Sequence, residues 1–184
     1  MSGDPETLCE GKHLVFLRRE GWEFVEHRTA RQAAMIVAVT PDAHIVLVEE
    51  FRPALDARVI SLPAGLVGDE GPEEPLHAAA RELREETGFD AEDFEHLTSG
   101  PGSAGASSEI VHFFLARGVR RSGEQSAQDK AQIRVHVIPL ASLSTWAKEQ
   151  ESEGLWVDPK VWAGVFLAGE TRARAALTSR AGKR

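Results

Sequence analysis

The sequence has little of what several classes of protein require. Its single cysteine, Cys9, excludes an internal disulfide and a metal site built from thiolates. Apolar runs are short, and none reaches the ~20 residues that a helix needs to cross a bilayer. The chain also opens without the charged and apolar segments of a signal peptide. We therefore expect a cytoplasmic protein that does not engage a membrane.

Positive charge is also scarce. The chain has 21 Lys and Arg against 29 Asp and Glu, which gives a formal net charge of −8. A nucleic-acid binder needs clustered basic side chains to neutralise phosphates, and no Lys/Arg cluster of this sequence supplies them. We expect no nucleic-acid partner. An acidic balance suits a protein that concentrates divalent cations, although many other proteins are equally acidic.

The order of predicted elements favours an α+β (mixed α/β) fold, and 184 residues suffice for one domain with a small appended element. Short runs of apolar or alternating residues predict strands at 13–18, 22–27, 33–39, 44–49, 58–62, 94–98, 110–116 and 133–138. Longer periodic stretches predict helices at 73–87, 140–149 and 159–178. Residues 117–131 are expected to form a polar loop that is long enough to suspect a function.

The predicted helix within residues 71–89 carries a cluster of carboxylates. Glu82 and Glu86 are four residues apart and project side by side, and Glu85 is next to them. Such carboxylates raise one another's pKa unless a cation intervenes, and Mg²⁺ or Mn²⁺ is the natural partner of clustered oxygen ligands. Arg81 can hold Glu85 through an i,i+4 pair. The alternative is a solvated acidic helix face.

The spacing of these residues resembles the Nudix box, G-x5-E-x7-R-E-U-x-E-E-x-G-U, where U is a bulky apolar residue. Glu73 is followed by seven residues and then by the run RELREETGF at 81–89. A chance match has a probability of roughly below one in a million per starting point at ordinary residue frequencies. Gly65 precedes Glu73 by eight positions where the pattern requires six, and two extra residues in the loop 66–72 account for the difference.

The resemblance extends over about residues 20–170 and points to the branch that hydrolyses ADP-ribose and nucleoside diphosphate sugars. It implies a Nudix-type α/β/α sandwich over residues 33–184. A small antiparallel β element would precede it at residues 1–32 and pack across a homodimer.

The same resemblance implies a metal site for Mg²⁺ or Mn²⁺. Its ligands would be the Ala64 carbonyl, from the run LPAG at 62–65, and the carboxylates of Glu82, Glu85 and Glu86. The metals would neutralise the pyrophosphate and activate the attacking water. Glu85 and Glu86 are therefore expected among the catalytic residues.

Two further residues are implied as substrate contacts. Arg52, in the run EFRP at 50–53, would contact phosphate, and a surface ion pair is the alternative. Glu109 ends the run SAGASSE at 103–109, which resembles the family's S-P-G-x-x-x-E except that alanine replaces proline. It would position substrate or metal, and the alternative is a solvated glutamate at a strand end.

The catalytic base does not follow directly from the resemblance. The family has a glutamate in the loop before a strand that this chain matches at 133–140, and the expected positions hold no glutamate. Asp129 and Glu124 are the carboxylates that the loop offers, and Asp129 is nearer to the strand. We expect Asp129 to be the base, with Glu85 or Glu109 as the next candidates.

The N-terminal segment supplies the last expected contacts. Trp22 and Arg28 resemble the residues that contact the adenosine part of the substrate in ADP-ribose hydrolases, where an aromatic ring stacks on the base. Packing in a core or an interface is the alternative for Trp22.

Together these features predict a hydrolase that cleaves ADP-ribose or a related nucleoside diphosphate sugar into a nucleoside monophosphate and a sugar phosphate. A dinucleoside polyphosphate or a damaged nucleoside triphosphate is the first alternative substrate. A nucleotide-binding regulator without catalysis is the second alternative, although none of the box carboxylates is lost.

Overall fold

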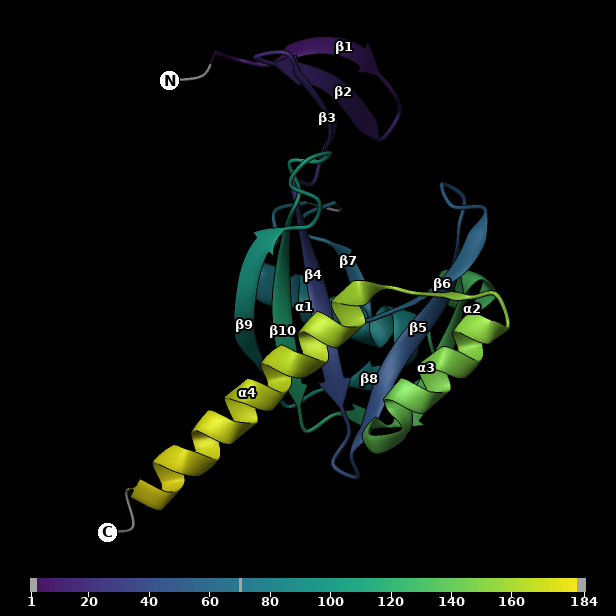
Figure 1. Ribbon diagram of the computed structural model, residues 1–184, viewed down its shortest axis with the longest axis vertical. Helices are drawn as coiled ribbons and strands as arrows, with labels where there is room; N and C mark the ends of the chain where they lie inside the picture. The colour runs from purple at the N-terminus through teal and green to yellow at the C-terminus, as the bar shows by residue number, and fades with distance from the viewer. Residues whose placement is uncertain (1–2, 70, 182–184) are drawn as a thin grey trace.

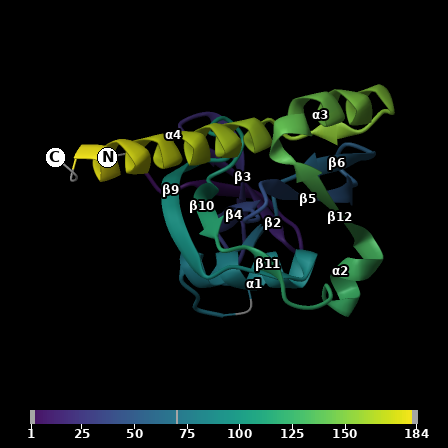
Figure 2. The ribbon, with the colours of Figure 1, turned by 90° about the horizontal axis from the view of Figure 1, so that it is seen from below.

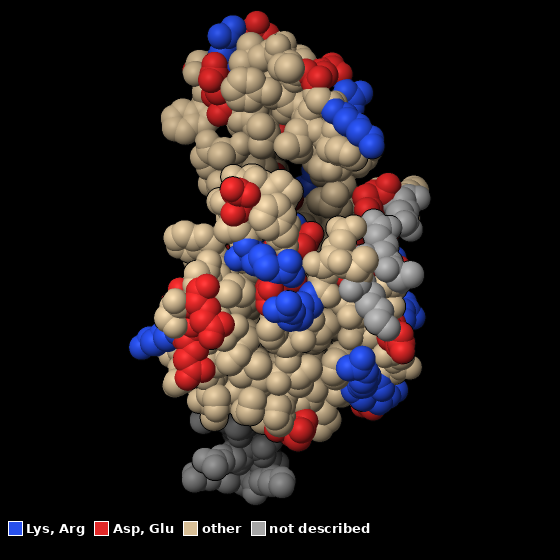
Figure 3. Space-filling model, turned by 90° about the vertical axis from the view of Figure 1, so that its right-hand side faces the viewer, with Lys and Arg blue, Asp and Glu red and all other residues tan. Residues whose placement is uncertain are grey.

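A small N-terminal sheet precedes a larger body in the computed structural model, which describes residues 3–69 and 71–181 (Figure 1). The small sheet has three antiparallel strands, β1 (Glu6–Glu10), β2 (Leu14–Arg19) and β3 (Trp22–His27). Glu20 and Gly21 form the turn between β2 and β3 with φ of 51° and 81°, at the predicted position. The strand β1 was not predicted. Figure 3 shows this sheet as a separate lobe above the body.

A mixed sheet of eight strands forms the centre of the body, in the order β13-β6-β5-β4-β10-β9, with β12 beside β5 and β7 beside β4. Its strands are β4 (Gln32–Val39), β5 (His44–Arg52), β6 (Ala57–Ser61), β7 (Ala64–Leu66), β9 (Asp93–Pro101), β10 (Ile110–Arg117), β12 (Ile133–Pro139) and β13 (Trp156–Val157). The pairs β4–β10 and β6–β13 are parallel, and the others are antiparallel. The short strands β8 (Phe89–Asp90) and β11 (Arg120–Arg121) pair separately.

Helices cover both faces of the central sheet, so the predicted α/β/α sandwich is confirmed. The helix α1 (Pro75–Thr87) lies on one face, and α3 (Leu143–Ser152) and α4 (Pro159–Ala181) lie on the other (Figure 2). A short helix α2 (Ala127–Gln132) precedes β12, and a 3₁₀ turn, η1 (Leu140–Ser142), precedes α3. No helix in the described part of the chain has the length and apolarity to cross a membrane.

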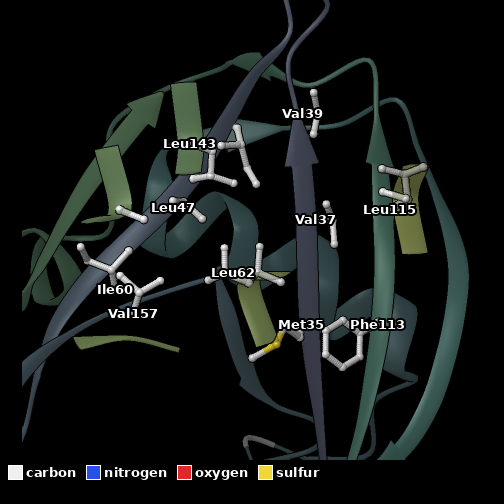
Figure 4. Close-up of a cluster of buried hydrophobic side chains, with 14 of the residues drawn as sticks. Met35, Val37, Val39, Leu47, Ile60, Leu62, Phe113, Leu115, Leu143 and Val157 are labelled. Atoms are coloured by element: carbon white, nitrogen blue, oxygen red, sulfur yellow. The ribbon is translucent and has the colours of Figure 1, made fainter. Parts of the chain in front are cut away.

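The strand β4 is buried on both faces and separates two hydrophobic clusters. Met35, Val37 and Val39 belong to the cluster under α3 and α4 (Figure 4). The alternate residues of β4 pack toward α1, where the strand and the helix both present alanines. Small side chains on both sides let α1 approach the sheet closely. This approach places the carboxylates of α1 next to the backbone of β7.

Several predicted boundaries were wrong. The helix expected from residue 73 begins at Pro75, because Glu73 directs its carboxylate to Arg81 instead of continuing the helix. The expected loop 117–131 contains β11 and most of α2, whose polar sequence AQDKAQ has no apolar period. The helix expected at 140–149 begins at Leu143, after η1.

Candidate functional site

The helix α1 has clear start and stop signals, which determine where its carboxylates lie. Glu74 occupies the N-cap position in an extended conformation without a side-chain capping hydrogen bond, and Pro75 occupies the first turn, where its missing N–H costs nothing. Gly88 ends it with φ of 73°, and its N–H donates to the Arg84 carbonyl. Between these ends, the side of α1 that carries Glu82 and Glu86 faces β7.

Glu86 is buried beside the backbone of β7. Its side chain accepts a hydrogen bond of 3.0 Å from the Ala64 N–H, and the residue is only 8% exposed. Burial raises the pKa of Glu86 to about 8, against the effect of the Ala64 N–H, and the negative charges of Glu82, Glu50 and Asp129 add to the rise. Glu86 is therefore a buried carboxyl group surrounded by charges of its own sign.

Glu82 lies against Gly65, whose lack of a side chain makes the contact possible. A Cβ at this position would come within 2.0 Å of the Glu82 carboxyl carbon. Burial raises the pKa of Glu82 to about 7, although Arg81 opposes the rise. The glycine that the Nudix pattern requires thus provides space for a metal-ligand candidate.

Arg81 connects four groups at the start of the site. It donates to Glu73 at 3.0 and 3.1 Å and to the Leu66 carbonyl at 3.2 Å. Its Nη1 also donates to Glu82 at 2.8 Å and to Glu85 at 3.1 Å, so the expected i,i+4 pair with Glu85 is confirmed. Arg81 therefore ties the loop before α1 to two of the three clustered carboxylates.

The donor set fits a hard divalent cation by its chemistry. Glu86 is buried and Glu82 is partly buried, and both carboxyl groups have raised pKa values. Glu85 is four residues from Arg81 on the same helix. Within residues 3–69 and 71–181, no three His, Cys, Asp or Glu side chains are already arranged around one metal position. Arg81 holds oxygens of both Glu82 and Glu85. Ala64 contacts Glu86 through its N–H, and its carbonyl as a ligand stays a prediction.

Asp129 acts electrostatically on this cluster. Its negative charge is one of the causes that raise the pKa of Glu86. Asp129 sits in the first turn of α2, where its N–H donates to Ser126 Oγ at 3.1 Å and its carboxylate accepts from the same hydroxyl. Glu124 is exposed in the loop before α2.

The expected substrate contacts lie around the site rather than within it. Arg52 is half exposed at the end of β5 and pairs with Glu50 at 2.9 Å. Glu109 precedes β10, and its N–H donates to Ser107 Oγ. Trp22 is 61% exposed on β3, and its indole N–H donates to the Gly105 carbonyl at 3.0 Å. Trp22 thus belongs to the N-terminal sheet, outside the carboxylate cluster of α1.

A cavity of about 510 Å³ lies between the base of the N-terminal sheet and the loop before α1. Arg28 lines it and pairs with Glu10 at 2.6 Å. Glu73 also lines it, so Arg81 connects this cavity to the carboxylates of α1. The volume is large enough for a nucleoside-sized group.

Sequence reasoning missed two residues of the site. Glu50 raises the pKa of Glu86 from β5, and Gln125 donates its side-chain N–H groups to the Glu86 carbonyl at 2.7 Å and the Ile133 carbonyl at 3.1 Å. A charged residue at the end of the apolar strand β5 was an available signal for Glu50. No local pattern identifies Gln125, because its partners are distant in sequence.

Comparisons with known proteins agree with this geometry. A model of the NUDIX domain matches residues 29–159. The methanol dehydrogenase activator of Bacillus methanolicus is 36% identical over 108 residues, which cover 59% of this chain and 57% of that protein. The ADP-ribose pyrophosphatase of Bacillus subtilis is 40% identical over 94 residues, which cover 51% of this chain and 48% of that protein. The alignments thus span about half the length of both relatives.

A solved structure shares the fold. The crystal structure of an ADP compounds hydrolase superposes with a TM-score of 0.66 and covers 92% of both chains, at 23% sequence identity.

Proposed function

This chain belongs to the NUDIX domain family, and we propose that it hydrolyses the pyrophosphate bond of ADP-ribose or a related nucleoside diphosphate sugar. The products would be a nucleoside monophosphate and a sugar phosphate. The observation that carries the proposal is the placement of the buried Glu86 and the partly buried Glu82, whose pKa values are raised to about 8 and about 7, on the same helix as Glu85. The relationship to an ADP-ribose pyrophosphatase supports the choice of substrate.

Nudix hydrolases generally use divalent metal ions, and we propose Mg²⁺ or Mn²⁺ for this one. Glu82, Glu85 and Glu86 would hold the ion together with the Ala64 carbonyl. When bound, the ion supplies charge neutralisation at the phosphates and a more acidic water.

The remaining roles belong to side chains of the chain itself. Arg81 orients Glu82 and Glu85, and the Ala64 N–H orients Glu86. Asp129 would accept the proton of the attacking water, as a carboxylate on the segment next to Glu86. Arg52, whose guanidinium is half exposed beside Glu50, would contact a phosphate.

The part of the substrate beyond the pyrophosphate would use the cavity of about 510 Å³. Arg28 lines this cavity and offers guanidinium donors to ribose or base oxygens. Trp22 contacts the loop 102–109, and Glu109 is the last residue of this loop. We propose that both residues contact the end of the substrate that is farther from the pyrophosphate. Trp22 would do so by stacking on the base.

We also propose a division into residues 1–32 and 33–184, with the first part forming a homodimer. Leu14 and Phe16 lie on the same face of β2 and are 48% and 38% exposed, so this small sheet leaves large apolar side chains uncovered. A second copy would cover these side chains. Light scattering should give a dimer at micromolar concentration, and a fully active monomer would contradict this part of the proposal.

A turnover assay tests the activity. Purified protein with Mg²⁺, Mn²⁺ or EDTA is offered ADP-ribose, GDP-mannose, UDP-glucose and diadenosine polyphosphates, and the products are identified by chromatography. We expect ADP-ribose to give AMP and ribose 5-phosphate only with the metal. Preferred cleavage of the diadenosine compounds would move the assignment to a dinucleoside polyphosphate hydrolase. Binding without cleavage of any of these substrates would favour a nucleotide-binding regulator.

A further inference from the structure

The segment from Ser122 to Gln132 packs against the C-terminal end of α1. The backbone N–H groups of Ser122 and Gly123 donate to the Gly88 carbonyl at 3.0 and 3.2 Å. The N–H of Ser126 donates to the Glu85 carbonyl at 2.8 Å. The last carbonyls of a helix have no partner within the helix, so these contacts satisfy groups that would otherwise need water.

The side chain of Gln125 completes this contact. Its Nε2 donates to the Glu86 carbonyl at 2.7 Å and to the Ile133 carbonyl at 3.1 Å. One acceptor belongs to the last turn of α1, and the other begins β12. A single half-buried amide therefore links the carboxylate-bearing helix to the strand that follows α2.

Gly88 makes the close packing possible. A Cβ at Gly88 would lie 2.6 Å from the Gly123 carbonyl oxygen, and the residue has φ of 73°. Only glycine therefore allows both the end of α1 and the approach of this segment. The glycine of the Nudix pattern here serves a contact with a segment more than thirty residues later in the chain.

The docked segment carries Asp129. Ser126, which is bonded to the Glu85 carbonyl through its N–H, also caps α2 and bonds to the Asp129 carboxylate. The position of Asp129 relative to Glu86 thus depends on contacts at the end of α1. Within the segment 122–132, the side chain of Gln125 donates a hydrogen bond to the backbone carbonyl of Glu86.

We propose that Gln125 is a positioning residue for hydrolysis, which holds Asp129 at the carboxylate cluster by docking the segment 122–132 on α1. The inference rests on the proposed function, because Asp129 is its base. Gln125 does not touch the reacting atoms, and it acts through the segment that it docks. Its loss should therefore affect the chemical step more than substrate binding.

The test is a double-mutant cycle in the full-length protein. Gln125→Met keeps the length of the side chain and removes both hydrogen bonds, and it should lower kcat roughly 10- to 100-fold with little change in KM. In an Asp129→Asn background the same substitution should change kcat less than about twofold, because the group that it positions is already lost. The matched control is Gln132→Met, at an exposed position of the same segment, which should leave kcat unchanged.

Two results would overturn the inference. One is an unchanged kcat in folded Gln125→Met, and the other is equal losses in the wild-type and Asp129→Asn backgrounds, which would indicate general damage. If the wild-type protein hydrolyses none of the substrates, the proposed function fails, and docking is then tested by amide hydrogen exchange. Faster exchange at Ser122, Gly123 and Ser126 in Gln125→Met supports the docking role, and unchanged exchange refutes it.

Discussion

Glu86 and Glu49 are both buried glutamates, but their surroundings have opposite charge. Glu49 is 1% exposed on β5 and accepts hydrogen bonds from Arg58, from Arg134 at 3.3 Å and from His136 at 2.8 Å. Burial alone would raise the pKa of Glu49, yet the hydrogen bonds from His136 and Arg58, together with the positive charges of Arg134 and Arg58, hold that pKa below its ordinary value. Glu86 has one backbone N–H and a pKa raised to about 8.

The comparison separates a carboxylate that is held by cations from one that we propose as a metal ligand. The partners of Glu49 come from β6 and β12, so its charge holds three neighbouring strands together. The charges that act on Glu86 are those of three other carboxylates, so a bound cation would favour its ionised form near neutral pH. Depth of burial does not distinguish the two residues, whereas the sign of the neighbouring charges does.

The largest expected effect is the loss of activity in Glu86→Gln. The substitution keeps the shape of the side chain and removes a charged ligand, so kcat should fall by at least about 100-fold, since a bound metal contributes several kcal/mol to charge stabilisation. The free energy of unfolding should not fall, because no buried ion pair is broken. Near-wild-type turnover of this variant at saturating Mg²⁺ would remove Glu86 from the metal site.

Asp129→Asn should have the next largest effect. As the proposed base, Asp129 should contribute about 10²- to 10⁴-fold to the chemical rate, with little effect on substrate affinity. Single-turnover kinetics measure the chemical step directly. Glu124→Gln, five residues earlier and exposed, is the control and should matter less. Full kcat in both variants and in their combination would place the base elsewhere, with Glu85 or Glu109 as the next candidates.

Glu49→Gln should destabilise the fold and spare the chemistry. Losing charge-assisted hydrogen bonds should lower the free energy of unfolding by about 2 kcal/mol, measured by urea denaturation. The control is Glu95→Gln, whose ion pair with Arg117 is half exposed and should contribute less than about 1 kcal/mol. Equal losses in the two variants would contradict the structural role assigned to Glu49.

The smallest effect concerns pH. The pKa values of Glu86 and Glu82 are about 8 and about 7 in the folded, metal-free protein, so between pH 7 and 8 Glu86 still binds a proton and Glu82 binds one in part. The ordinary pKa of a glutamate is 4.5, so the same residues bind no proton in the unfolded chain at this pH. Because the folded state binds more protons, stability should fall as the pH rises, by about 1.4 kcal/mol per pH unit for each proton. The lowered pKa of His112 has the opposite effect, but mainly below its ordinary 6.5.

Chemical denaturation at pH 7.0, 7.5 and 8.0 measures this slope. It should be smaller in Glu86→Gln, which has lost one of the titrating groups, and saturating Mg²⁺ should reduce it in the wild-type protein. A wild-type slope of zero without metal would show that these carboxyl groups are already ionised at pH 7.

The helices and strands that were predicted correctly from the sequence are those with strong local patterns. Burial of a strand or of one helix face requires apolar residues at regular positions. This pattern allowed β4, β5 and α1 to be predicted from the sequence. The short helix α2 was missed because it is held by its Ser126 cap and by docking on α1 rather than by an apolar face. Tertiary contacts, not local propensity, account for that helix.

The sequence by itself determined the register of the carboxylates on α1. Residues four apart on a helix project side by side wherever the helix lies, so the spacing of Glu82 and Glu86 sufficed. What only the tertiary structure decided is which buried glutamate is paired with cations. Glu49 and Glu50 are neighbours in one strand, yet Glu49 faces arginines from β6 and β12 while Glu50 adds negative charge at Glu86. The pKa of a buried carboxyl group depends on charges brought near it by folding, and sequence distance does not reveal them.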